Sequence, residues 1–183
     1  QSNLITVDLI CHGVPSPKLF NDYIAWLNRS GRLVKFDFRT KSKPWGYGSK
    51  NFGCRITYKS ILGRRHVKKV DTLKARVFLN LFFSNTCLRP HCYDCPYAAV
   101  EKPADITIAD FWAVLAHTEK GKKLIETLPD LEWKETTIDK IAKKQAMTKA
   151  STPKSTSYDR FWSDYYANGF KYIAKKYGKY NAK

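Results

Sequence analysis

The chain has 183 residues, 43% of them hydrophobic and 14% aromatic, and its 33 lysines and arginines outnumber 16 acidic residues for a net charge of +17. This composition excludes a disordered chain, and the length suits one domain whose core is large enough to fold without disulfides. No apolar run approaches the roughly 20 residues of a membrane helix, so we expect no membrane span.

The first predicted elements are a strand, a loop and a helix. The β-branched run at residues 4–10 predicts a buried strand. Ser16 and Pro17 have the residue types of a helix N-cap and a first helical position, and the helix that they begin should end near Ser30. The intervening Cys11-His12-Gly13 loop follows the carboxyl end of a strand, where open α/β sheets place ligands, and its glycine predicts a positive φ or a close approach of backbone.

The rest of the chain alternates between strand-like and helix-like patterns. Further strands are predicted at residues 33–39, 52–58, 64–69 and 104–109. Further helices are predicted at residues 72–84, 121–128 and 139–147. A linker of serine, threonine and proline at residues 151–157 precedes an aromatic helix, whose rings we expect in a core or interface stripe. These patterns predict an α/β protein, with α+β as the alternative, in which helices pack on a mixed sheet beside a cysteine-rich loop.

The cysteines point to metal or redox chemistry. There are five, an odd number, and three of them lie close together in the sequence, which is not the pattern of a secreted disulfide framework. This usage is typical of a reducing compartment, and we expect a cytoplasmic protein.

The clustered cysteines have the spacing C-x4-C-x2-C over residues 87–95. Short spacers let successive thiolates surround a soft metal, and this spacing with a distant fourth cysteine is known for one type of iron–sulfur cluster. Zinc is the alternative, with His91 or His12 as a nitrogen ligand. Cys11 is the best candidate for a distant ligand, whereas Cys54 fits the interior of a strand. Cys87 follows an apolar helix and fits either a ligand or the core.

Carboxylates and basic residues give weaker signals. Asp110 follows the strand predicted at 104–109 and is a candidate functional carboxylate, with capping of the next turn as the alternative role. The basic residues are scattered along the chain without a known nucleic-acid recognition module, so a solvated basic surface is favoured over a nucleic-acid site.

Four motifs occur in a specific order between residues 4 and 112: DLICHGVPSP at 8–17, FDFRTK at 36–41, LRPHCYDCPYA at 88–98 and ADITIADFW at 104–112. Together they resemble the C-terminal domain of the coenzyme F420 hydrogenase/dehydrogenase beta-subunit family. The resemblance is greatest to the bacterial branch, in which this domain follows a ferredoxin-like segment.

The resemblance implies a redox protein with an iron–sulfur cluster of the [4Fe–4S] type and a flavin such as FAD. Carried over by motif, Cys11, Cys92 and Cys95 are cluster ligands, and Cys87 is the candidate for the fourth. Electrons would pass to or from a redox partner protein or the N-terminal ferredoxin-like segment. The function implied is an iron–sulfur oxidoreductase, with catalytic residues unassigned.

The same resemblance indicates a cofactor-binding stretch after the second strand. Arg39, Lys41 and Gly46 would face the anionic part of a flavin, because guanidinium and ammonium groups bind phosphate well, and Asp110 completes this set. The family's strand motif normally ends Gly-Asp-Phe-Trp-Gly, whereas alanines stand at both glycine positions here, Ala109 and Ala113. The short connection after Ala113 indicates a shortened or omitted loop.

We therefore expect a family-like domain at residues 4–150, followed at 151–183 by a linker and an aromatic helix. The chain is interpreted as a fragment of a longer protein, and we expect the isolated fragment to be inactive. Two alternatives from other classes are a zinc-stabilised structural or interaction module, which would use the same cysteines, and, with less support, a basic nucleic-acid-binding module.

Overall fold

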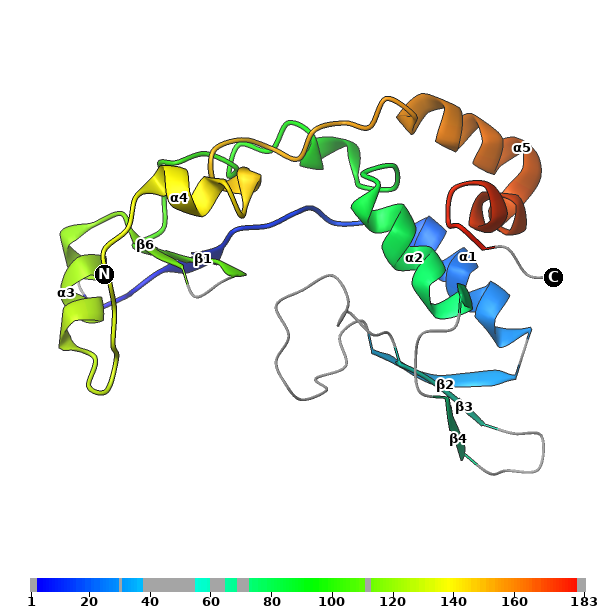
Figure 1. The fold of residues 1–183 in the computed structure, drawn as a ribbon, viewed down its shortest axis with the longest axis horizontal. Coiled ribbons are helices and arrows are strands. Elements are labelled where there is room, and N and C mark those ends of the chain that lie inside the picture. The colour runs from blue at the N-terminus through cyan, green and yellow to red at the C-terminus, as the bar shows by residue number, and fades with distance from the viewer. Residues whose placement is uncertain are drawn as a thin grey trace. The chain divides into compact units, whose positions relative to one another are not determined.

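The computed structural model describes residues 3–29, 31–37, 55–59, 65–68, 73–110 and 113–180. By its contacts the chain divides into two compact units, each built from two separate segments (Figure 1). The first unit consists of Gln1–Gly13 and Pro90–Pro153, and the second consists of Val14–Arg89 and Lys154–Lys183. Because the division reflects only how densely residues contact one another, the domain boundary predicted at residue 150 stays a prediction.

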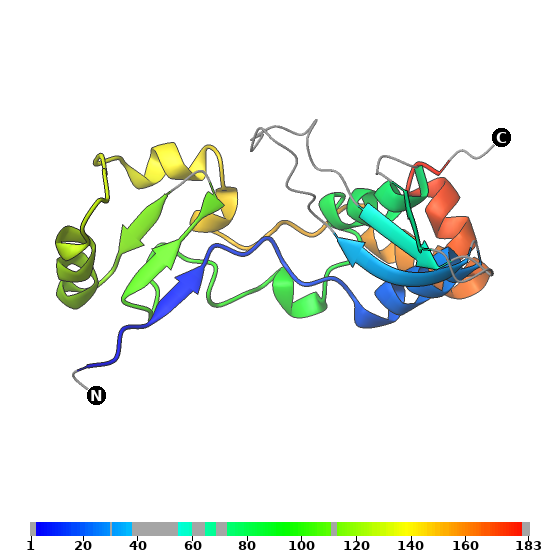
Figure 2. The same cartoon turned by 90° about the horizontal axis from the view of Figure 1, so that it is seen from below.

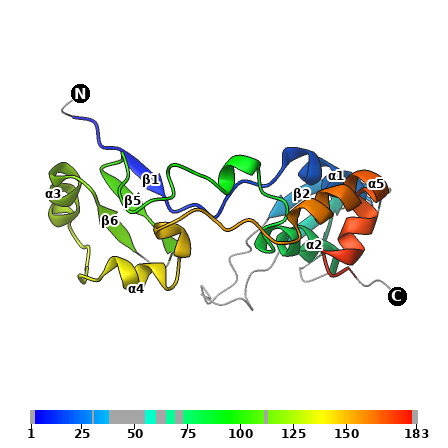
Figure 3. The ribbon, with the colours of Figure 1, turned by 90° about the horizontal axis from the view of Figure 1, so that it is seen from above.

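The first unit contains a mixed three-stranded sheet. Its strands are β1 (Val7–Leu9), β5 (Ile106–Ile108) and β6 (Val114–Ala116). The central strand β5 runs parallel to β1 and antiparallel to β6 (Figure 3). The same unit holds the helices α3 (Glu119–Thr127) and α4 (Ile138–Ala142) and the 3-10 turns η1 (Pro90–Cys92) and η3 (Ala146–Thr148).

The first strand differs from its prediction in length and burial. It covers three residues, and its outward-facing Val7 and Leu9 are 55% and 63% exposed. The prediction of a buried strand over 4–10 was therefore wrong in this respect. Among the described strands, β1 pairs with β5 alone and forms the edge of its sheet, so β-branched residues here mark an extended backbone without marking burial.

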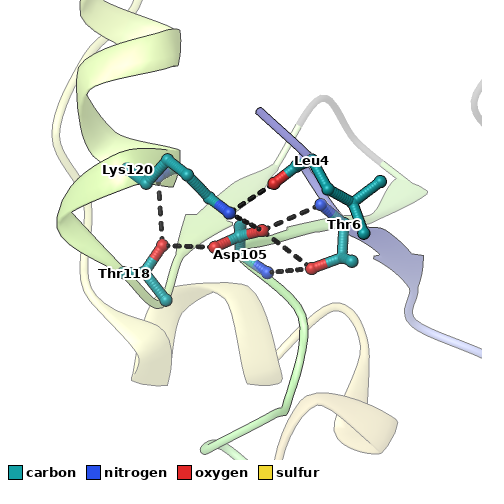
Figure 4. A network of polar contacts seen from close by, with 6 residues as sticks. Leu4, Thr6, Asp105, Thr118 and Lys120 are labelled. Carbon is teal, nitrogen blue, oxygen red and sulfur yellow. Dashed lines mark hydrogen bonds and ion pairs between the residues drawn. The ribbon is translucent and has the colours of Figure 1, made fainter. Parts of the chain in front are cut away.

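A carboxylate at the start of β5 ties the first unit together (Figure 4). The Oδ2 atom of Asp105 accepts hydrogen bonds from the backbone N–H and the hydroxyl of Thr6, both at 2.8 Å, and its Oδ1 atom accepts one from the Thr118 hydroxyl at 2.7 Å. Lys120 Nζ lies 3.2 Å from the same carboxylate. The Thr118 hydroxyl also caps α3 by accepting the Gly121 N–H. These hydrogen bonds, above all that from the Thr6 N–H, hold the pKa of Asp105 well below its usual value.

The second unit is an antiparallel sheet with helices on one face (Figures 1 and 2). The strands are β2 (Arg32–Asp37), β3 (Arg55–Lys59) and β4 (Arg65–Lys68), in that order. The helices are α1 (Pro17–Asn28), α2 (Leu73–Phe83) and α5 (Tyr158–Lys176). The sequence predicted one mixed sheet, and the described strands instead form two sheets, because β2, β3 and β4 pair among themselves. The predicted class, α/β or α+β, is confirmed.

Local signals in the second unit worked as expected at α1. The Ser16 hydroxyl accepts a hydrogen bond from the Leu19 N–H, and Pro17 occupies the first turn. Trp26 on the same helix is buried, with its ring centroid 4.9 Å from that of Tyr180. The C-terminal segment supplies this contact, which short-range periodicity does not reveal.

The core of the second unit is rich in aromatic rings. Tyr23 is fully buried, stacks on Phe78 at 5.3 Å between centroids and meets Phe36 edge-on at 5.6 Å. The ring-rich face predicted for the last helix is confirmed in part, since Phe161 is buried whereas Tyr166 is 71% exposed. None of the helices within the described residues combines the length and apolar character needed to cross a membrane.

Candidate cysteine site

Three of the predicted ligand cysteines belong to the first unit. Cys11 lies in the loop after β1 and is exposed, while Cys92 and Cys95 lie in and just after η1 and are partly exposed. Cys87, in contrast, belongs to the second unit and is buried. Cys54 lies outside the described residues. The cysteines that matched the predicted motif thus do not share one environment.

The surroundings of Cys87 favour a core residue over a ligand. The side chain is fully buried in the hydrophobic core of the second unit, and this burial raises the pKa of its thiol to about 12. Its environment is that of a core cysteine, the second of the two roles that the sequence left open for it. The Cys87 backbone has a structural role, since its carbonyl accepts the N–H of Ser16 at 2.8 Å.

The Cys92 and Cys95 thiols sit in a tightly turned segment. The N–H of Tyr93 bonds the carbonyl of Pro90 at 3.1 Å, and the N–H of Ala98 bonds the carbonyl of Cys95 at 3.0 Å. These turns keep the two cysteines on one short loop, where both residues are half-buried.

The Cys11 loop continues directly from the parallel pair of strands. The N–H of Ile10 bonds the carbonyl of Ile108 at 3.0 Å, which extends the β1–β5 ladder by one residue before the loop begins. Gly13 ends this segment with a φ of 142°, so the positive φ predicted there is confirmed.

Two residues that were not predicted from the sequence contact the cysteine loops, Ser151 at one loop and Thr152 at the other. The Cys95 N–H donates to the Ser151 hydroxyl at 2.8 Å, and the Thr152 hydroxyl donates to the carbonyl of His12, the neighbour of Cys11. The sequence indicated only a polar linker at 151–157. Its run of hydroxyl residues was the available signal, but their partners are 56 and 140 positions away in the chain.

A second polar group, also missed from the sequence, lies on one face of the first sheet. Thr107, which is fully buried, donates its hydroxyl to Asp8 and lies 2.8 Å from Nε2 of His117. Because the hydroxyl has one proton, His117 must donate from Nε2. Lys102 completes the group, with its side chain 3% exposed and its Nζ 3.6 Å from the Asp8 carboxylate. This group anchors the segment after the cysteine loop to β1.

The donor set fits a thiolate-bound group in its chemistry. Cys11, Cys92 and Cys95 offer soft sulfur donors that are accessible and belong to one unit. Within the part of the chain that the structure describes, however, no three His, Cys, Asp or Glu side chains are gathered closely enough to hold a metal ion. His12 and His91, the alternative zinc ligands, are half-buried and exposed respectively.

Most of the predicted flavin-binding residues fall in parts of the chain that the structure does not describe. Arg39, Lys41 and Gly46 lie outside the described residues. Asp110 is described and is an exposed residue just after β5. The flavin prediction therefore stays a prediction.

Comparison with known proteins identifies the family. The family model for the C terminus of the coenzyme F420 hydrogenase/dehydrogenase beta subunit matches residues 1–158. No curated protein and no solved structure matches the chain. The family is named for redox enzymes, which makes this domain oxidoreductase-related, and a beta subunit implies association with other subunits. The chain belongs to the family formed by the C-terminal domains of coenzyme F420 hydrogenase/dehydrogenase beta subunits.

Proposed function

We propose that this chain is an electron-transfer domain, and that the intact protein carries a [4Fe–4S] cluster on the thiolates of Cys11, Cys92 and Cys95. The observation that supports this most is that three accessible thiols lie on two loops of one unit, and both loops are hydrogen-bonded to one dipeptide at residues 151–152. Membership of a family named for redox enzymes agrees with it. A bound cluster would supply a site that takes up and releases single electrons.

The chain's own residues would hold and orient the cluster. Cys92 and Cys95, separated by a two-residue spacer, would supply two thiolates, and Cys11, in the loop after β1, would supply the third. Cys11, Cys92 and Cys95 are at least partly exposed, whereas Cys87 is fully buried in the apolar core of the second unit. For that reason we leave Cys87 out of the proposed ligand set, and the fourth ligand is not assigned.

The test is the metal content of the full-length protein after anaerobic purification. We expect broad visible absorbance near roughly 400 nm with stoichiometric iron and acid-labile sulfide. A colourless protein with one bound zinc would reject the cluster in favour of the zinc-stabilised module. Absence of both metals would mean that the cysteines are ordinary loop residues in this protein and would reject the proposed function.

A further inference from the structure

We propose that Ser151 and Thr152 position the two cysteine loops, acting as one short clamp between them. Neither the sequence motifs nor the family match assigns a role to these two residues. The clamp rests on the proposed function only for its purpose, because the hydrogen bonds that define the clamp do not depend on any bound group.

Ser151 engages both polar groups of the Cys95 backbone. Its Oγ atom accepts the Cys95 N–H at 2.8 Å, and its hydroxyl proton is directed to the Cys95 carbonyl at 3.4 Å. A hydroxyl can do both at once, since it has one proton to donate and two lone pairs to accept. The backbone that carries the Cys95 thiol is thereby fixed from one side by a single side chain.

Thr152 holds the other loop. It is 2% exposed, and its hydroxyl donates to the carbonyl of His12. Consecutive Cα atoms are about 3.8 Å apart across a trans peptide, so the Cys95 loop and the Cys11-His12 loop are attached to the two ends of one peptide unit. A change in either attachment alters the placement of one cysteine loop relative to the other.

The clamp itself is supported from the preceding turn. In η3 the Thr148 hydroxyl donates to the carbonyl of Gln145 at 2.7 Å, and the Lys149 N–H bonds the carbonyl of Ala146 at 3.0 Å. Gln145 and Thr148 are both buried. Residues that orient ligands act best when their own conformations are fixed by such a support, and this one leads directly into Ser151.

Two variants with matched rescues test the clamp in the full-length protein. Ser151→Ala should speed hydrogen exchange of the Cys95 amide about fivefold or more, because that amide loses its partner, and Ser151→Thr should restore slow exchange. Thr152→Val should change the carbonyl ¹³C shift of His12, and Thr152→Ser should return it. Thr156→Ala, at an exposed position of the same linker, is the control and should leave both readouts unchanged.

Cobalt(II) serves as a separate probe of thiolate binding, read from its charge-transfer absorbance. We expect Ser151→Ala and Thr152→Val to weaken Co(II) binding by about 10- to 100-fold, as loss of partners that orient metal ligands usually does. If the wild-type protein binds neither Co(II) nor a cluster but the exchange and shift changes occur, the clamp stands and the proposed function fails. Two results together would overturn the clamp, even in a protein that binds a cluster. In Ser151→Ala, the Cys95 amide would exchange at a rate within about twofold of wild type. In Thr152→Val, the carbonyl shift of His12 would be unchanged.

Discussion

Replacement of Gly121 by alanine tests how α3 docks in the first unit. A Cβ at this position would lie 2.3 Å from the carbonyl oxygen of Asp105 and 3.0 Å from Cγ1 of Ile106, whereas ordinary contact begins near 3.4 Å. The helix must therefore move away from the start of β5. The same Asp105 carbonyl accepts the N–H of His117 at 2.9 Å, so this movement also strains a backbone hydrogen bond.

Two opposing effects set the magnitude. Alanine favours the helix over glycine by about 1 kcal/mol. Overpacking costs about 1–3 kcal/mol, and weakening the backbone hydrogen bond adds about 1 kcal/mol. The steric effect should win, so Gly121→Ala is expected to lower the free energy of unfolding of the first unit by about 1–3 kcal/mol.

The assay is urea denaturation combined with hydrogen exchange at the β5 amides, which reports on the first unit even if the two units unfold separately. Lys122→Ala is the matched control, because it changes an exposed neighbour on the same helix to the same residue. A Gly121→Ala protein as stable as wild type, or more stable by the helix-propensity gain, would refute the close approach of α3 to Asp105.

Three buried groups supply the remaining predictions. The lowered pKa of the Asp105 carboxylate stabilises the folded protein above its unfolded pKa of about 3.9, and this stability is lost as the pH falls toward the lowered folded pKa. Asp105→Asn should remove this contribution. Wild type and variant should therefore differ in the free energy of unfolding at neutral pH and converge in acid. The Cys87 thiol, with its pKa raised to about 12, should resist iodoacetamide at pH 8 in the native protein while the exposed Cys11 reacts, and rapid native labelling of Cys87 would contradict its burial. Tyr23→Phe should cost about 1 kcal/mol in the free energy of unfolding, because the buried hydroxyl donates to the Ala75 carbonyl at 3.1 Å, and an unchanged urea midpoint would contradict that bond.

Prediction from sequence succeeded where the signal was local. The Ser16-Pro17 start of α1 and the positive φ of Gly13 each depend on neighbouring residues, and both are confirmed. The family also followed from motifs in order along the chain, and the family match over residues 1–158 confirms it.

Features set by distant contacts were beyond that reasoning. The sequence left Cys87 open as a ligand or a core residue, and only the packing of the second unit shows it fully buried. The burial of Trp26 depends on the C-terminal segment, and the attachments of Ser151 and Thr152 join parts of the chain 56 and 140 positions apart. No spacing rule connects such residues, because long-range hydrogen bonds form only once the tertiary structure places their partners.

The central claim, that the thiolates of Cys11, Cys92 and Cys95 hold a cluster and Cys87 does not, is tested most directly by iron content across four single variants. Cys11→Ser, Cys92→Ser and Cys95→Ser, purified anaerobically as full-length proteins, should each lose most of the iron and sulfide bound by wild type. Cys87→Ala, matched as a buried cysteine of the other unit, should keep both. Loss of iron in Cys87→Ala without loss of folding, or full iron content in the other three variants, would contradict the account.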